Sequence, residues 1–429
     1  MKAKQCVAVV MMTWTLCAAA WAGGPNVKLG IDVLREDGFK LLDGKRVGLI
    51  TNPTGVSGDL KSTVDLLHNA ANVKLVALYG PEHGVRGDAY AGDKVESGTD
   101  PATKLPVYSL YGATRQPTAE MLDGLDTLVF DIQDIGSRSY TFISTMTVAM
   151  QAAAEHKLQF VVLDRPNPLG GDRIEGKPLD MEFRSFIGFL PIPYLHGMTV
   201  GELAQMINDE GWLEGGVKCD LTVVKMEGWK RSMCFDDCGL VWVPSSPHVP
   251  RAESAMFYAA TGIMGELHVV SEGVGYPLPF ELVGLPDADA ERFASELDKR
   301  NLPGVRFRPI YFKPYYGPNK GKVCGGAQVH LIDPDKVHLT SIQFHVMDVV
   351  RSSFPDSKLF DSKRKKSFDK ACGTDEIRNL LKPASPLRIF SRSGMRALTT
   401  FAMHGRSTCS ISKPTVPLLC EQCRRQIDV

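Results

Sequence analysis

The stretch Arg46-Val47-Gly48-Leu49-Ile50-Thr51 is a short apolar run without the polar alternation of a half-exposed strand. It predicts a strand buried on both faces, which is typical of parallel sheets. Amphipathic segments and further apolar runs alternate after it. We predict helices over 60–70, 118–125 and 140–156, and strands over 73–79, 127–130 and 160–163. This alternation indicates an α/β fold in which helices cover both faces of a Rossmann-like parallel sheet.

The pattern changes in the second half of the chain. A helix and a strand first continue the alternation, and an acidic helix then introduces strands with polar positions. The elements expected here are 198–211, 221–226, 287–299, 305–309, 327–332 and 342–352. We therefore predict a Rossmann-like domain over 23–284, a smaller α+β domain over 285–385 and a cleft between the two domains.

Residues 1–22 have the pattern of a secretory signal peptide. Lys2 and Lys4 precede an apolar run over 7–20, which ends in Ala20-Trp21-Ala22. The run is shorter than the roughly 20 apolar residues that a membrane span needs, so we expect no stable membrane insertion after cleavage. We expect a secreted protein that resides in the bacterial periplasm.

The segment 386–429 fits neither domain. It holds seven basic residues against two acidic ones, and it has three cysteines and no sustained hydrophobic period. It is either a flexible basic extension or the product of a frameshift that replaced the natural C-terminus. We favour the frameshift.

The composition is that of a globular protein. The chain has 429 residues, of which 44% are hydrophobic, and 49 basic residues balance 49 acidic ones. Enough apolar residues are present for packed cores, and the absence of a basic excess gives no reason to expect a nucleic-acid partner. The sequence makes no prediction of oligomeric state.

Five cysteines belong to the body of the chain: Cys219, Cys234, Cys238, Cys324 and Cys372. In an exported protein, an odd number leaves at least one free thiol, and Cys234 with Cys238 is the pair to test for a disulfide. A structural zinc site is a weaker interpretation, because no second Cys/His pair stands at a finger-like distance.

Polar side chains follow each predicted strand of the sheet. The carboxyl ends of parallel strands meet at one edge, where ligands bind in open α/β sheets. These groups exceed what the architecture requires, so we place the functional site there. The candidates are Asn52, Glu82, His83, Arg86, Asp131, Gln133, Asp134, Arg138, Asp164, Arg165 and Asn167.

Several sequence motifs that mark known classes of enzyme are absent, which restricts the reactions that the site can catalyse. No Gly-x-Gly-x-x-Gly, phosphate loop or Gly-x-Ser-x-Gly motif is present, which disfavours a nucleotide cofactor and a serine nucleophile. Carboxylates, amides and arginines suit glycoside hydrolysis. Glu82 is the preferred general acid, because its glycine-rich loop can approach a substrate closely. The second carboxylate stays open among Asp93, Glu96, Asp131 and Asp134.

Four strings resemble the exo-β-N-acetylmuramidase family, which has YbbC-like members and was formerly a domain of unknown function. They lie at 80–87, 105–112, 131–141 and 164–171, and begin Gly-Pro-Glu-His, Leu-Pro-Val-Tyr, Asp-Ile-Gln-Asp and Asp-Arg-Pro-Asn. The resemblance covers about residues 28–383. It implies release of N-acetylmuramic acid from the non-reducing end of peptidoglycan fragments.

The resemblance also implies residue roles. Glu82 matches the motif glutamate and becomes the catalytic acid. Asp93 stands where relatives have glutamate, so its catalytic role would have to tolerate a side chain one methylene shorter. The matching positions that we expect to bind substrate or support it are Asp131, Gln133, Arg138, Arg165, Asn167, His196, Glu272 and Glu281.

The lactyl carboxylate of muramic acid needs a cation. Arg86, Arg138 and Arg165 are candidates, because a guanidinium binds a carboxylate with two parallel hydrogen bonds. The alternative for each is an internal salt bridge to Asp131 or Asp164. Aromatic candidates for stacking on a sugar are Tyr140, Tyr276 and Trp242, although core packing suits Trp242 better.

The sequence favours a glycosidase that needs neither metal nor cofactor, and two other functions are alternatives to it. One is a non-catalytic protein that binds peptidoglycan-derived fragments on the same fold. The other is a metal-dependent hydrolase that uses His83, His196 and Asp131. A glycosidase forms product, whereas the binding protein does not. A glycosidase without metal stays active in a strong chelator, whereas the metal-dependent hydrolase does not.

Overall fold

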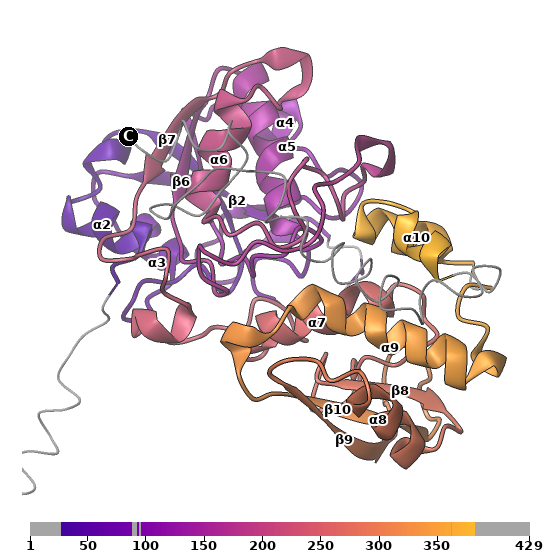
Figure 1. The fold of residues 1–429 in the computed structure, drawn as a ribbon. Coiled ribbons are helices and arrows are strands. Elements are labelled where there is room, and N and C mark those ends of the chain that lie inside the picture. Colours follow the sequence, from indigo (N-terminus) through magenta and orange to yellow (C-terminus); the bar gives the residue numbers. More distant parts are fainter. Residues whose placement is uncertain (1–26, 88–91, 94–95, 362, 382–429) are drawn as a thin grey trace, which may run out of the picture.

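The computed structural model describes residues 27–87, 92–93, 96–361 and 363–381. A seven-stranded sheet forms the first unit, with the strand order β3-β4-β2-β1-β5-β6-β7 (Figure 1). Six of these strands are parallel, and only β3 runs antiparallel, at the edge beside β4. Their bounds are β1 Arg46–Thr51, β2 Lys74–Gly80, β3 Gly98–Thr99, β4 Pro106–Ser109, β5 Thr127–Asp131, β6 Gln159–Leu163 and β7 Asp220–Val224.

Helices cover both faces of this sheet, as the sequence predicts. Successive strand residues point to opposite faces. Leu49 and Val129 pack on the face that α2 and α3 cover, whereas Ile50 and Phe130 pack on the face of α4, α5 and α6. The helices are α2 Gly30–Glu36, α3 Thr63–His68, α4 Ala119–Leu122, α5 Phe142–Glu155 and α6 Val200–Asp209. The α/β prediction is confirmed.

A second, smaller unit contains a three-stranded antiparallel sheet of order β8-β10-β9, with α7 against α9 on one side (Figure 1). Two short helices, α10 and α11, end the described chain. The bounds are α7 Ser254–Gly265, β8 Leu282–Pro286, α8 Ala290–Asp298, β9 Val305–Phe312, β10 Cys324–Leu331, α9 Leu339–Ser353, α10 Lys365–Cys372 and α11 Glu376–Leu380.

The division between the units differs from the predicted 284/285. β8 pairs with β10, and α7 packs on α9, so residues from about 254 onward belong to the second unit. The sequence hides α7 because apolar or small residues surround nearly its whole circumference, which leaves no amphipathic period. The predicted signal peptide (1–22) and the atypical tail (386–429) lie outside the described residues.

The five cysteines of the body are all free thiols, so the pair singled out for a disulfide test does not form one. Cys234 and Cys238 bracket a 3₁₀ turn, and the Cys238 thiol donates to the Cys234 carbonyl oxygen over 3.3 Å. This local bond turns one sulfur to the backbone instead of to the other thiol. Within the described ranges, no helix combines the length and the apolarity that crossing a bilayer requires.

Candidate active site

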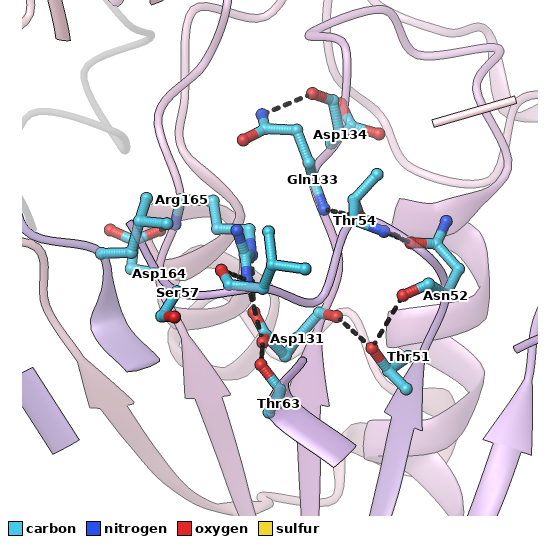
Figure 2. Close-up of polar contacts among 12 residues, drawn as sticks. Thr51, Asn52, Thr54, Ser57, Thr63, Asp131, Gln133, Asp134, Asp164 and Arg165 are labelled. Carbon is cyan, nitrogen blue, oxygen red and sulfur yellow. Dashed lines mark hydrogen bonds and ion pairs between the residues drawn. The ribbon is translucent and has the colours of Figure 1, made fainter. Parts of the chain in front are cut away.

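An ion pair occupies the point where the strand order reverses, between β1 and β5 (Figure 2). Arg165 Nε and Nη2 donate to the two carboxylate oxygens of Asp131 over 2.6 and 2.9 Å. The Thr63 hydroxyl donates to Asp131 Oδ2 over 2.6 Å. Asp131 is fully buried and Arg165 is 3% exposed. In this bidentate pair, each charge is balanced by the other inside the protein, so the pair supports the fold.

Amide side chains fix the two loops beside this pair (Figure 2). Asn52 Oδ1 accepts from the Thr54 amide over 2.9 Å, and the Gln133 amide donates to the Thr54 hydroxyl over 2.8 Å. Gln133 Nε2 donates to the Asp134 and Pro166 carbonyls. Asn52 Nδ2 is buried and has no partner in the described part of the chain. Asn52 is therefore the residue of these loops with a donor still available.

The residues after β6 support the start of α6. Asp164 accepts from the Gly201 amide over 2.8 Å and from the Thr199 hydroxyl over 3.0 Å. Burial raises the pKa of Asp164 to about 7, against the effect of these donors. Asn167 Nδ2 donates to the Met198 carbonyl over 3.0 Å. Asp164 and Asn167 thus hold a loop and a helix together.

Two of the arginines expected to bind a carboxylate have internal partners. Arg138 is fully buried, and its terminal nitrogens donate to backbone carbonyls, including that of Cys372 over 2.8 Å. It therefore ties α10 to the first unit. Arg86 is partly exposed and pairs with the buried carboxylate of Asp100 at 2.7 Å. The internal salt bridge to Asp131 considered in the sequence analysis is confirmed for Arg165, whereas Arg86 pairs with a different carboxylate, Asp100.

Asp134 and His196 form a buried polar contact next to Gln133. His196 Nε2 lies 3.9 Å from Asp134 Oδ2, and His196 Nδ1 accepts from the Met198 amide. Burial raises the pKa of Asp134 to about 7 and lowers that of His196 to about 3. The pair therefore favours a neutral acid beside a neutral imidazole. Asp134 Oδ1 and His196 Nε2 have no hydrogen-bond partner among the described residues.

The second unit contributes two of the predicted carboxylates. Glu272 is buried against α7, its Oε2 has no partner within the described residues, and burial raises its pKa to about 7. Glu281 pairs with Arg251, and burial raises its pKa despite that cation. Of these two carboxylates, only Glu272 has a buried oxygen without a partner among the described residues.

Glu82 is only partly buried, on the loop after β2, and both of its oxygens accept hydrogen bonds. The Thr141 hydroxyl, next to the start of α5, donates to Oε2 over 2.6 Å. The Gly92 amide donates to Oε1 over 2.9 Å, which brings the neighbouring exposed Asp93 to the same loop. The Asp93 backbone therefore lies next to the residue that binds the Glu82 carboxylate.

Two tyrosines surround Glu82. Burial, the charge of Glu82 and a hydrogen bond with that carboxylate raise the pKa of Tyr111 to about 12. Burial raises the pKa of Tyr140, whose hydroxyl is 2.7 Å from Ser245 Oγ. The sequence analysis missed the roles of Thr141 and Tyr111. Both lie in strings that carry the family resemblance, which was the available signal.

The Glu82 loop lies beside His248, a residue that contacts the second unit. His83 is buried and has a left-handed backbone with φ of 72°. Burial and the nearby His83 lower the pKa of His248, whose ring stacks on Tyr316 with centroids 5.8 Å apart. Segments from both units therefore meet beside Glu82.

The aromatic candidates differ in position. Trp242 packs edge-on against Phe235, and both line a small, shallow cleft beside Arg165. Tyr276 contacts Phe312 in the second unit. Tyr140 alone of the three is close enough to Glu82 for that charge to affect its pKa. Within the described residues, no three His, Cys, Asp or Glu side chains come together in a group that could hold a metal.

Comparisons with known proteins agree with this architecture. Residues 47–253 match the family description "Exo-beta-N-acetylmuramidase NamZ, N-terminal", and residues 256–407 match the C-terminal counterpart. The two matches meet where the structure divides, and the second continues into the segment predicted as an atypical tail.

Individual relatives cover almost the whole chain. The peptidoglycan beta-N-acetylmuramidase NamZ of Bacillus subtilis is 45% identical over 401 residues, which is 92% of this chain and 95% of that protein. Two solved DUF1343 family proteins from Bacteroides fragilis are 50% and 28% identical, with TM-scores of 0.81 and 0.68. They match over 88% of this chain, and over 95% and 97% of their own lengths. The chain therefore belongs to the NamZ family of exo-β-N-acetylmuramidases.

Proposed function

We propose that the chain hydrolyses the glycosidic bond of N-acetylmuramic acid at the non-reducing end of peptidoglycan fragments. Family membership over both units and a relative described as a peptidoglycan beta-N-acetylmuramidase support this function. The local observation that carries it is Glu82, a partly exposed carboxylate held by Thr141 and Gly92 where both units meet. Acetal cleavage requires a carboxyl group placed in this way.

In the proposed mechanism, Glu82 donates the proton that the leaving oxygen needs. The Thr141 hydroxyl and the Gly92 amide fix both carboxyl oxygens, so the group has one orientation toward the substrate. The side chains of Tyr111 and of the buried Tyr140 lie near it. Holding the carboxyl group in a reactive orientation supplies part of the rate enhancement.

Asp93 is the proposed second carboxylate, which activates water or stabilises the developing positive charge. It is exposed and directly follows the residue whose amide binds Glu82. Asp131 suits this role less well, because Arg165 and Thr63 occupy its oxygens. An exposed carboxylate can meet a water molecule without breaking a buried ion pair.

We further propose export to the periplasm, on the basis of the N-terminal pattern over 1–22. Expression of the full chain in a Gram-negative host, followed by cell fractionation and N-terminal sequencing, tests this. A periplasmic protein that begins at Gly23 is expected. A cytoplasmic protein that retains Met1 would overturn the proposal.

A product assay tests the enzymatic proposal. The wild-type chain is incubated with peptidoglycan oligosaccharides that carry a fluorescent tag at the reducing end, and products are identified by mass spectrometry. Free N-acetylmuramic acid and tagged fragments one residue shorter are expected. Fragments cut internally would contradict exo action. Binding without any product would indicate a wall-fragment binding protein instead.

A further inference from the structure

Muramic acid differs from glucosamine by a lactyl ether, whose carboxylate is the group that an enzyme selective for muramic acid must recognise. The three arginines that the sequence suggested for this task are engaged elsewhere. Arg86 pairs with Asp100, Arg165 pairs with Asp131, and Arg138 donates to buried backbone carbonyls. A cation that faces the substrate must come from another position.

Arg115 is a cation of this kind. Its side chain is exposed, and its guanidinium carbon lies 4.0 Å from the ring centroid of Phe186 and 4.8 Å from that of Tyr111. The two rings lie 6.2 Å apart, so the guanidinium contacts both. No carboxylate in the described part of the chain forms an ion pair with it. The charge is therefore positioned without being neutralised.

This position is next to the proposed catalytic group. Tyr111 contacts the Arg115 guanidinium with its ring and hydrogen-bonds with Glu82. One phenol ring therefore separates the cation from the carboxylate, and both lie on the side of the sheet where β2 and β4 end. A sugar whose glycosidic oxygen meets Glu82 can direct its lactyl group toward Arg115.

We propose that Arg115 binds the lactyl carboxylate of the terminal N-acetylmuramic acid and thereby sets the preference for muramic acid over glucosamine. The inference rests on the proposed function and names the residue that gives it specificity. Stacking on Tyr111 and Phe186 restricts the guanidinium before substrate binds, so less rotamer entropy is lost on binding. The planar fork then offers two parallel hydrogen bonds to the carboxylate.

Calorimetry with free sugars tests the inference without depending on turnover. Dissociation constants are measured for N-acetylmuramic acid and for its lactyl methyl ester, which has no negative charge and is larger by one methyl group. The wild-type chain should bind the acid roughly 30-fold more tightly than the ester, a ratio typical of a hydrogen bond to a charged group. In Arg115→Gln, this ratio should fall to about one.

Two further variants separate charge recognition from structural damage. Arg115→Lys keeps the charge but loses the planar fork, and it should give an intermediate ratio. Arg184→Gln removes another stacked arginine, 4.1 Å from the Phe189 ring, whose charge already faces Glu214. This control should keep the wild-type ratio. Thermal unfolding of each variant establishes that it is folded.

A wild-type chain that binds acid and ester equally, or an Arg115→Gln variant that keeps the full ratio, would overturn the role of Arg115. Failure of the proposed function would look different. The wild-type chain would then release no N-acetylmuramic acid from oligosaccharides, whatever the two dissociation constants are.

Discussion

Two polar regions lie at the carboxyl edge of the large sheet, and they differ in how their charges are used. Around Asp131, the arginine and threonine partners occupy both carboxylate oxygens in the protein interior (Figure 2). Around Glu82, the carboxyl group is partly exposed and lies beside Tyr111, which an exposed arginine contacts. The first region stabilises the sheet edge, and the second can meet a substrate.

This difference shows that the strand order of the sheet does not by itself predict where the catalytic residues lie. Ligands in open α/β sheets usually bind where the strand order reverses. Here that position is filled by the Asp131–Arg165 ion pair, and the proposed catalytic loop follows β2, one strand further out. The β2 loop is also where His83 lies near His248, whose ring stacks on Tyr316 of the second unit.

The largest expected effect is the loss of stability when the buried ion pair is broken. Asp131→Asn leaves Arg165 charged and buried without its partner, which should cost about 3–5 kcal/mol of unfolding free energy. Asp59→Asn is the matched control. It removes a carboxylate that pairs with Arg35 and Lys61 at the surface, and it should cost no more than about 1 kcal/mol. Urea denaturation measures both. Equal losses would refute the structural role of the cluster.

The next effect concerns pH. Burial raises the pKa of Asp134 from 3.8 to about 7, so the folded chain holds this proton more tightly than the unfolded chain. Stability should therefore fall as pH rises from about 4 to 7. Asp134→Asn removes this contribution, and its stability relative to wild type should increase over that range by at most about 4 kcal/mol, at about 1.4 kcal/mol per pH unit.

Asp164 and Glu272, whose pKa values burial also raises to about 7, contribute equally in both proteins, so the difference isolates Asp134. Urea denaturation at pH 4, 5.5 and 7 measures it. A constant difference between variant and wild type at all three values would contradict a protonated Asp134.

A smaller effect is expected at the hydroxyl that positions Glu82. Thr141→Val keeps the shape of the side chain but removes the donor to Glu82 Oε2, and kcat should fall roughly 10-fold. Thr147→Val is the control on α5, the helix that Thr141 precedes, because its hydroxyl donates to the Ile143 carbonyl. Its kcat should equal that of wild type. Parallel losses in both variants would show a general effect of α5 instead.

Much of the fold follows from sequence patterns. Apolar runs locate β1, β2, β5 and β6 because strands covered on both faces need continuous apolar residues. The patterns do not reveal α7, which is apolar nearly all round, and its omission moved the predicted domain boundary. Local periodicity therefore finds elements that have one exposed face or a continuous apolar run.

The site is less predictable, because it depends on partners far apart in sequence. The motifs predict that Glu82, Asp131 and Arg165 lie at one edge of the sheet. They do not predict that Asp131 and Arg165 form an ion pair with each other. Arg138 could not be recognised as a structural residue, since its carbonyl partner Cys372 is 234 positions away. Side-chain direction in loops, as for Arg115, has no periodic signal.

The central claim is that Glu82 performs chemistry and does not support the fold. Its most direct test is Glu82→Gln, with release of N-acetylmuramic acid and unfolding free energy measured on the same preparation. We predict that kcat falls at least about 100-fold, as for loss of a general acid, while stability changes by no more than about 0.5 kcal/mol. Unchanged release of N-acetylmuramic acid by a folded Glu82→Gln protein would contradict the account.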